Sequence, residues 1–171
     1  MINSDSRFSV RFIVFSILSI ACMILIFIFS NENATESSGT SGVFVDVIVN
    51  NFIKDFDNLP PEKHQSIIDS IQFAVRKTAH FSIYLLLGFL VSCAFGKRKI
   101  LSRISILTIA ICFFYACSDE LHQYFIPGRA CRFTDVLIDS SGSIVGMLLS
   151  LLCLKIAYSI IDKNNYNKKE K

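Results

Sequence analysis

Four long apolar segments limit the folds that this 171-residue chain can adopt. The first, residues 12–29, carries no charged side chain. It is close to the roughly 20 residues that a helix needs to cross a hydrocarbon core. It is too long for the apolar part of a signal peptide, and no small-x-small cleavage site follows it. Because 52% of the residues are hydrophobic, composition also indicates a membrane protein.

The remaining apolar segments predict three more spans, over residues 78–96, 104–125 and 135–157. In the 104–125 span the uncharged part ends at Cys117, which is too early for a complete crossing. The helix is therefore expected to continue through SDELHQ toward Phe125, with Pro127-Gly128 as its stop signal. The predicted fold class is all-α, an integral membrane protein with four transmembrane helices.

The distribution of positive charge predicts the orientation of these spans. Residues 1–11, 97–103 and 155–171 together hold 11 of the 17 basic residues and three of the 14 acidic residues. The positive-inside rule therefore places both termini and the 97–103 loop in the cytoplasm. The connections 30–77 and 118–134 are expected to face outward, and residues 158–171 form a basic cytoplasmic tail.

The first outward connection is expected to contain two helices. Residues 30–42 have the composition of a flexible polar linker. Residues 43–56 favour an amphipathic helix at the membrane interface, and a second helix is predicted from Glu62 into the next span. The apolar face predicted for the first of these helices consists of Phe44, Val47, Ile48, Phe52 and Phe56.

Ionisable residues collect at the predicted outer ends of the last three spans, although they are scattered along the sequence. They are Arg76, Lys77, His80, Asp119, Glu120, His122, Arg129, Arg132, Asp135 and Asp139, with Tyr84 and Gln123 beside them. Asp119, His122 and Gln123 share one helical face because they are spaced i, i+3, i+4. Ionisable groups at this depth are usually buried in protein and paired. Gly142 and Gly146 form a small-xxx-small pair, which predicts a close approach by another helix.

Two interpretations of this cluster remain open. In the first, Arg129 or Arg132 neutralises the carboxylates, and the network is a salt-bridged cap that locks the helix ends. In the second, the cluster is a functional pocket. Glu120 or Asp119 then acts as a base, and His122 or His80 carries the proton. The predicted substrate-binding residues are Arg129, Arg132, Lys77, Tyr84, Gln123, Asp135 and Asp139.

The same side chains are also suitable ligands for a divalent ion. No spacing in the chain matches a zinc pattern such as HExxH, however. The sequence analysis therefore assigns no metal ligand and no cofactor.

The two polar stretches RKTAHFSIYLLLGFL and SDELHQYFIPGRACRFTDVLIDSSGSIVG resemble the signature of the VanZ-like membrane proteins. The family pattern reads K-x-x-H-F-x-E-Y, then D-E-x-H-Q-x-F-x-P-G-R, then T-D-x-x-x-D/N-x-x-G. The resemblance covers residues from about 20 to 155 and implies one VanZ-like domain. Two departures stand out. Ile83 replaces the usual Glu before Tyr84, and Ser30-Asn31-Glu32 replaces the usual Ser-Ser-Gln.

The resemblance implies a multi-pass protein of the bacterial cell membrane that acts at the cell envelope. The name-giving member of the family is associated with resistance to the glycopeptide antibiotic teicoplanin. The leading hypothesis is a pocket that binds or processes an anionic envelope or lipid-linked substrate. The alternative is a non-enzymatic binding or scaffold protein, so catalysis is left open. A small transporter ranks last, because carriers bind substrate near the midplane.

The expected partners follow from the same resemblance. They are membrane lipids and either a cell-wall precursor or the glycopeptide antibiotic. Nucleic acid is not expected, because the basic tail after residue 157 carries no folded domain that would bind it.

Overall fold

The computed structural model describes residues 4–32, 34–53, 56 and 59–167, and within these residues the chain forms five helices and no strand. The helices are α1 (Ser4–Ser30), α2 (Ala34–Phe52), α3 (Pro61–Phe95), α4 (Arg103–Gln123) and α5 (Phe133–Asn167). All of these except α2 contain a stretch that is long and apolar enough to cross a membrane. The predicted all-α membrane fold with four candidate spans is confirmed.

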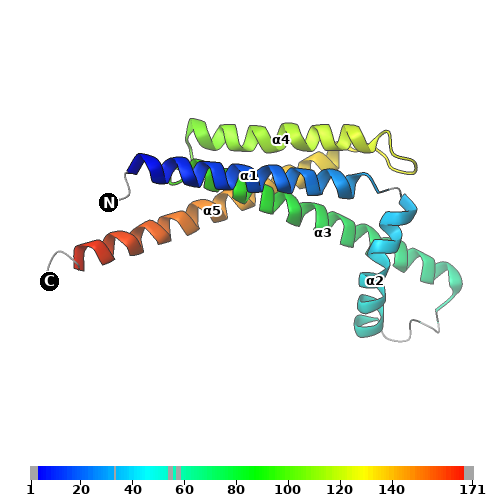
Figure 1. Ribbon diagram of the computed structural model, residues 1–171. Helices are drawn as coiled ribbons and strands as arrows, with labels where there is room; N and C mark the ends of the chain where they lie inside the picture. Colours follow the sequence, from blue (N-terminus) through cyan, green and yellow to red (C-terminus); the bar gives the residue numbers. More distant parts are fainter. Residues whose placement is uncertain (1–3, 33, 54–55, 57–58, 168–171) are drawn as a thin grey trace.

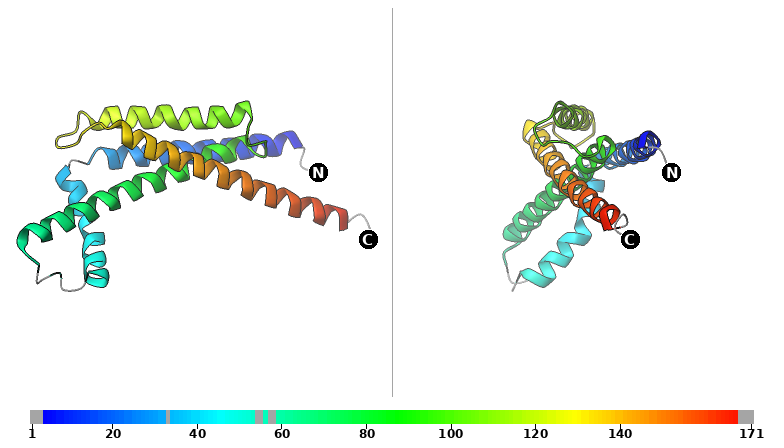
Figure 2. Two further views of the ribbon diagram at one scale, coloured as in Figure 1. Left: turned by 180° about the vertical axis from the view of Figure 1, so that it is seen from behind. Right: turned by 90° about the vertical axis from the view of Figure 1, so that its left-hand side faces the viewer.

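The four long helices run alternately in opposite directions, and α2 lies across α3 at a steep angle (Figure 1). Both chain ends lie at one end of the bundle. The end of α1, the start of α3 and the α4–α5 loop lie at the other end (Figures 1 and 2). We call this second end the polar end, because the ionisable cluster described below lies there.

Local sequence signals account for the helix boundaries. Pro61 occupies the first turn of α3, where its missing N–H leaves no bond unmade. Ser102 begins α4, and its hydroxyl accepts a hydrogen bond from the Ser105 N–H at 3.1 Å. The chain leaves α4 after Gln123 and turns at Gly128, whose φ of 78° favours glycine. The helix therefore continues through SDELHQ and stops before Pro127-Gly128, as predicted.

Glycines make the crossing of α3 and α5 possible (Figure 2, right). A Cβ on Gly146 would collide with the Leu85 carbonyl oxygen of α3, and one on Gly142 with that of Phe81. On the opposite helix, a Cβ on Gly88 would collide with the Ser143 carbonyl. The two backbones are thus in direct contact, and the predicted small-xxx-small approach is confirmed.

Two features of the outward connection differ from the sequence prediction. The helix α2 begins at Ala34, so residues 34–42 are helical and do not form a flexible linker. Its buried side chains are Val45 and Val49, whereas Phe44 and Val47, predicted on the apolar face, are exposed. The physical reason is that tertiary packing against α3 selects which face is buried and can stabilise a Ser/Thr-rich helix of poor propensity. Phe56 lies beyond the end of α2, and the Phe52 side chain is outside the described part.

The helix predicted from Glu62 into the second span is one continuous helix, α3. One other predicted boundary changes. The last helix, α5, continues to Asn167, well into the segment assigned to the tail.

At the end of the bundle opposite the polar end, Arg98 ties α3 to α4. Its guanidinium donates to the Ser92 and Gly96 carbonyls, and to the hydroxyls of Ser92, Ser105 and Thr108, at 3.0–3.1 Å. These bonds satisfy buried groups of both helices. We expect Arg98→Ala to lower the free energy of unfolding by about 2–3 kcal/mol.

The matched control for this prediction is Lys99→Ala, because the Lys99 side chain is exposed. Thermal unfolding in detergent is a suitable measurement. Equal midpoints of thermal unfolding for the two variants would contradict a stabilising role for the Arg98 hydrogen bonds between α3 and α4.

Candidate functional site

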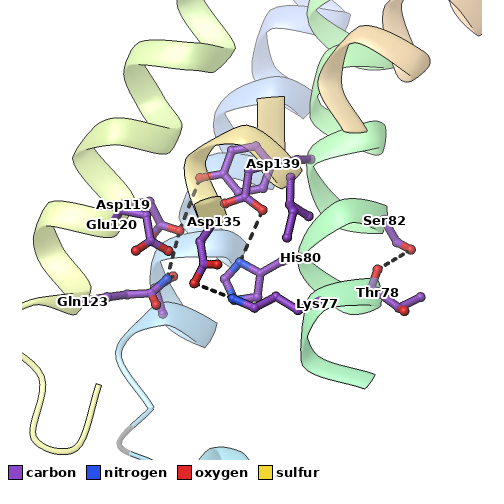
Figure 3. Close-up of polar contacts among 12 residues, drawn as sticks. Lys77, Thr78, His80, Ser82, Asp119, Glu120, Gln123, Asp135 and Asp139 are labelled. Atoms are coloured by element: carbon purple, nitrogen blue, oxygen red, sulfur yellow. Dashed lines mark hydrogen bonds and ion pairs between the residues drawn. The ribbon is translucent and has the colours of Figure 1, made fainter. Parts of the chain in front are cut away.

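The ionisable residues of three helices converge at the polar end of the bundle (Figure 3). Lys77 and His80 come from α3, Asp119 and Glu120 from α4, and Asp139 from α5. Asp119, Glu120 and Asp139 are only 4%, 1% and 1% exposed. A group of buried carboxylates in an apolar bundle is costly unless its charges are compensated. The contacts of each carboxylate therefore define what the site can do.

Two ion pairs connect α3 to α5. The Lys77 ammonium contacts the Asp135 carboxylate, and both side chains are partly exposed. One turn deeper, His80 Nδ1 lies 3.7 Å from Asp139 Oδ1. This spacing is an ionic contact that is too long for a hydrogen bond. Figure 3 shows the His80 ring pointing from α3 toward α5.

Asp119 is held by side chains from two helices. Its Oδ2 atom accepts from the Tyr84 hydroxyl of α3 at 3.2 Å and from the Gln123 amide of α4 at 3.3 Å. The same amide donates to the hydroxyl of Ser30, the last residue of α1, at 3.2 Å. Tyr84, Ser30 and Gln123 are themselves buried, so this network orients the carboxylate rigidly.

The loop after α4 is held by backbone contacts more than by ion pairs. Glu120 Oε2 accepts from the Arg132 backbone N–H at 3.0 Å, while the Arg132 side chain is exposed. Arg129 donates to the Glu32 carbonyl at 2.9 Å, to the Gln123 side-chain oxygen at 3.3 Å and to the Phe29 carbonyl at 3.4 Å. Its guanidinium therefore caps the end of α1.

The salt-bridged cap, as formulated from the sequence, required an arginine to neutralise the carboxylates. Among the residues that the structure describes, the salt bridges involve Lys77 and His80, and neither Arg129 nor Arg132 takes part in one. Burial and the neighbouring Arg76 lower the pKa of the Arg129 guanidinium, and nearby carboxylates oppose that change. Arginine stays charged at neutral pH, because its pKa starts far above that range.

His122 lies apart from the other predicted site residues. Its Nε2 is 3.3 Å from the Asn31 side-chain oxygen, and its ring stacks on Phe27 of α1 with centroids 4.7 Å apart. The i, i+3 spacing correctly predicts that His122 lies on the same side of α4 as Asp119. On that side, however, His122 packs against α1. His80 is therefore the histidine that faces the carboxylates.

Two adjoining pockets open at the polar end. The polar pocket, of about 190 Å³, is lined by Phe73, Arg76, Lys77, His80, Glu120, Gln123, Gly128, Arg129, Ala130, Arg132 and Asp135. The apolar pocket, of about 270 Å³, is lined by Ile26, Phe29, Glu32, Phe44, Val75, Arg76, Ala79, His80, Ile83 and Arg129. Three basic residues, Arg76, His80 and Arg129, line both pockets. They therefore lie where the polar pocket meets the apolar pocket.

The structure thus brings together most of the predicted site residues. They are Lys77, His80, Tyr84, Asp119, Glu120, Gln123, Arg129, Asp135 and Asp139, with the Arg132 side chain at the pocket rim.

Sequence reasoning gave no role to Arg76 and to the end of α1. Arg76 lines both pockets, and Ser30, Asn31 and Glu32 each contact a residue of α4 or the following loop. The i, i+4 spacing of Arg76 and His80 is the signal that places both on one face. Ile83, which departs from the family pattern, adds to the apolar pocket.

The fold and the site define a class: an all-α membrane protein with buried carboxylates beneath a cationic pocket. The sequence model of one family, VanZ/LLP1, matches residues 15–154. The chain therefore belongs to the VanZ/LLP1 family, as the resemblance of its motifs predicted. Comparison with curated proteins and with solved structures found no match.

Proposed function

We propose that this chain is a multi-pass protein of the bacterial cell membrane whose polar end faces outward and binds an anionic lipid-linked envelope precursor. In this proposal the protein binds or processes the precursor and so contributes to resistance against glycopeptides such as teicoplanin. In the same proposal both termini are cytoplasmic, and this part is supported by the basic residues in residues 1–11, 97–103 and 155–171.

The observation that carries the proposal is the pair of adjoining pockets. A lipid-linked phosphate has a compact anionic head and a long apolar chain. The polar pocket offers Arg76, Lys77 and Arg132 to the head. The apolar pocket offers Ile26, Phe29 and other apolar side chains to the first part of the tail.

The buried carboxylates supply the chemistry in this proposal. Glu120 lines the polar pocket and would act as acid or base toward a bound head group. Asp119 and Asp139 lie deeper, where Tyr84 and His80 contact them. These contacts suit groups that hold charge beneath the substrate.

A non-enzymatic binding or scaffold role remains the second candidate. The specific observation in its favour is that Arg129 contacts two backbone carbonyls of the α1 end, which is a structural role. In that case the carboxylates only fix the helix ends, and their charge is dispensable for protection.

The first test measures lipid binding directly. The purified chain is reconstituted in nanodiscs and titrated with a polyprenyl phosphate, and separately with the corresponding polyprenol. Arg76 is the residue to change, because no hydrogen bond or ion pair holds its side chain within the described residues. Arg76→Ala is expected to weaken phosphate binding about tenfold, the effect of one charge-assisted contact.

Lys63→Ala is the matched control, because Lys63 is an exposed basic residue of the same helix, and it should bind like the wild type. Binding of polyprenol as tight as that of its phosphate would refute recognition of the anionic head. An unchanged affinity in Arg76→Ala would refute the polar pocket as the site.

A further inference from the structure

The two deepest carboxylates of the cluster have oxygens without a hydrogen-bond partner. Both carboxylate oxygens of Asp139 are fully buried and accept no hydrogen bond, and the same is true of Asp119 Oδ1. Buried polar atoms in native proteins are nearly always paired, so each exception needs an explanation. Here three such atoms lie in one place.

Basic side chains also compensate the negative charge of Asp119 and Asp139 only in part. Among the described residues, His80 is the basic side chain in ionic contact with Asp139, and its Nδ1 stays beyond hydrogen-bond distance at 3.7 Å. Lys77, one turn away on α3, is paired with Asp135. Asp119 receives neutral donors only, from Tyr84 and Gln123. Two buried carboxylates and one imidazole are therefore short of positive charge.

The three side chains have the arrangement of a ligand set. One ligand atom from each of His80, Asp119 and Asp139 lies within 4.8 Å of the other two. A separation of 3.7 Å between His80 Nδ1 and Asp139 Oδ1 fits two atoms that are each about 2.1 Å from one ion. Binding of one ion by all three atoms requires side-chain rotation to close any separation longer than about 4.2 Å. We propose that His80, Asp119 and Asp139 bind a divalent metal ion of the zinc or manganese class.

The donor types select this class of ion. One imidazole nitrogen with two carboxylate oxygens suits Zn²⁺ or Mn²⁺, whereas Ca²⁺ and Mg²⁺ prefer oxygen alone. Three protein ligands leave at least one coordination position open, as in catalytic metal sites. His80 lines both pockets, so the open position lies toward them. Tyr84 and Gln123 donate hydrogen bonds to Asp119 Oδ2, and metal ligands in proteins commonly have such hydrogen-bond partners.

This inference goes beyond the proposed function. A metal ion at this position would polarise a phosphate oxygen of the bound head group, but metal binding itself requires no lipid. The metal site and the lipid-binding proposal can therefore be refuted independently of each other. A failed metal titration refutes only the metal site, because the lipid titration rests on Arg76 in the polar pocket, and a chain that binds metal without lipid refutes only the lipid proposal.

The test uses the full chain, purified without a polyhistidine tag, stripped with chelator and reconstituted in nanodiscs. It is titrated with Mn²⁺ and with Zn²⁺, and its metal content is measured after desalting. We expect one ion per chain in the wild type and affinity at least about 100-fold weaker in His80→Ala and in Asp139→Asn. Asp69→Asn, which changes an exposed acid of α3, is the control and should bind like the wild type.

Thermal unfolding separates a lost site from a lost fold. Without metal, Asp139→Asn should be at least as stable as the wild type, because the substitution removes a buried carboxylate that accepts no hydrogen bond from the described residues. With metal, only the wild type and Asp69→Asn should gain stability. Wild type that retains no ion after desalting overturns the proposal, and so does equal binding by Asp139→Asn.

Discussion

Glu120→Gln is expected to abolish any protection that the chain gives against teicoplanin, while leaving its fold intact. The Glu120 side chain is 1% exposed and lines the polar pocket. A glutamine keeps its volume and an oxygen that accepts from the Arg132 N–H, so the loop contact survives. The substitution removes the negative charge and the ability to exchange a proton, and general acid–base catalysis contributes about 10²–10⁴-fold to rate.

Susceptibility to teicoplanin and vancomycin in a sensitive Gram-positive host is the measurement, at matched abundance in the membrane. Glu62→Gln, an exposed acid in the first turn of α3, is the control and should behave as the wild type. If Glu120→Gln protects as well as the wild type, the polar cluster is a structural cap and not a reactive site. If the wild type itself gives no protection, the resistance part of the proposal fails.

Gly146→Leu is expected to have the largest effect on stability. Any side chain at this position meets the Leu85 carbonyl of α3, and backbone atoms cannot be repacked as a flexible side chain can. Helices α3 and α5 would have to separate, and the contacts at Gly88 and Gly142 would be lost with them. Overpacking of this kind costs about 3 kcal/mol or more.

Val145→Leu is the matched control, because Val145 is the neighbouring residue and is 38% exposed. Midpoints of thermal unfolding in detergent compare the two variants. A Gly146→Leu midpoint equal to that of Val145→Leu would show that the helices can separate at no cost. The same separation would pull His80 from Asp139, so metal binding should fall together with stability.

The fold was largely readable from the sequence. Apolar length, positive charge at the ends of the spans and the Pro127-Gly128 signal are local properties, and they predicted helices close to α1, α3, α4 and α5. The boundaries of α2 were missed, because a Ser/Thr-rich segment gives a weak local helix signal, and the same helix carries Val45 and Val49, which are buried. The buried face of α2 depends on its packing against α3.

The candidate site was predictable as a set of residue types at one depth, but not as a set of contacts. Helical spacing placed Asp119 and Gln123 on one face, and they do share the network around Tyr84. The same spacing could not tell that His122 would lie against α1. Nor could it assign the hydrogen bonds of Arg129, which go mainly to backbone carbonyls.

The sequence by itself determined the membrane-spanning helices and placed the polar cluster at one end of them, because span length and helical spacing are local; the resemblance to the VanZ-like proteins came from the motifs in that cluster. Only the tertiary structure decided that His80, Asp119 and Asp139 meet, since each comes from a different helix. Ligand patterns such as HExxH detect two ligands on one helix. A triad assembled across α3, α4 and α5 depends on how closely the helices approach, and here the glycines of the α3–α5 crossing set that distance.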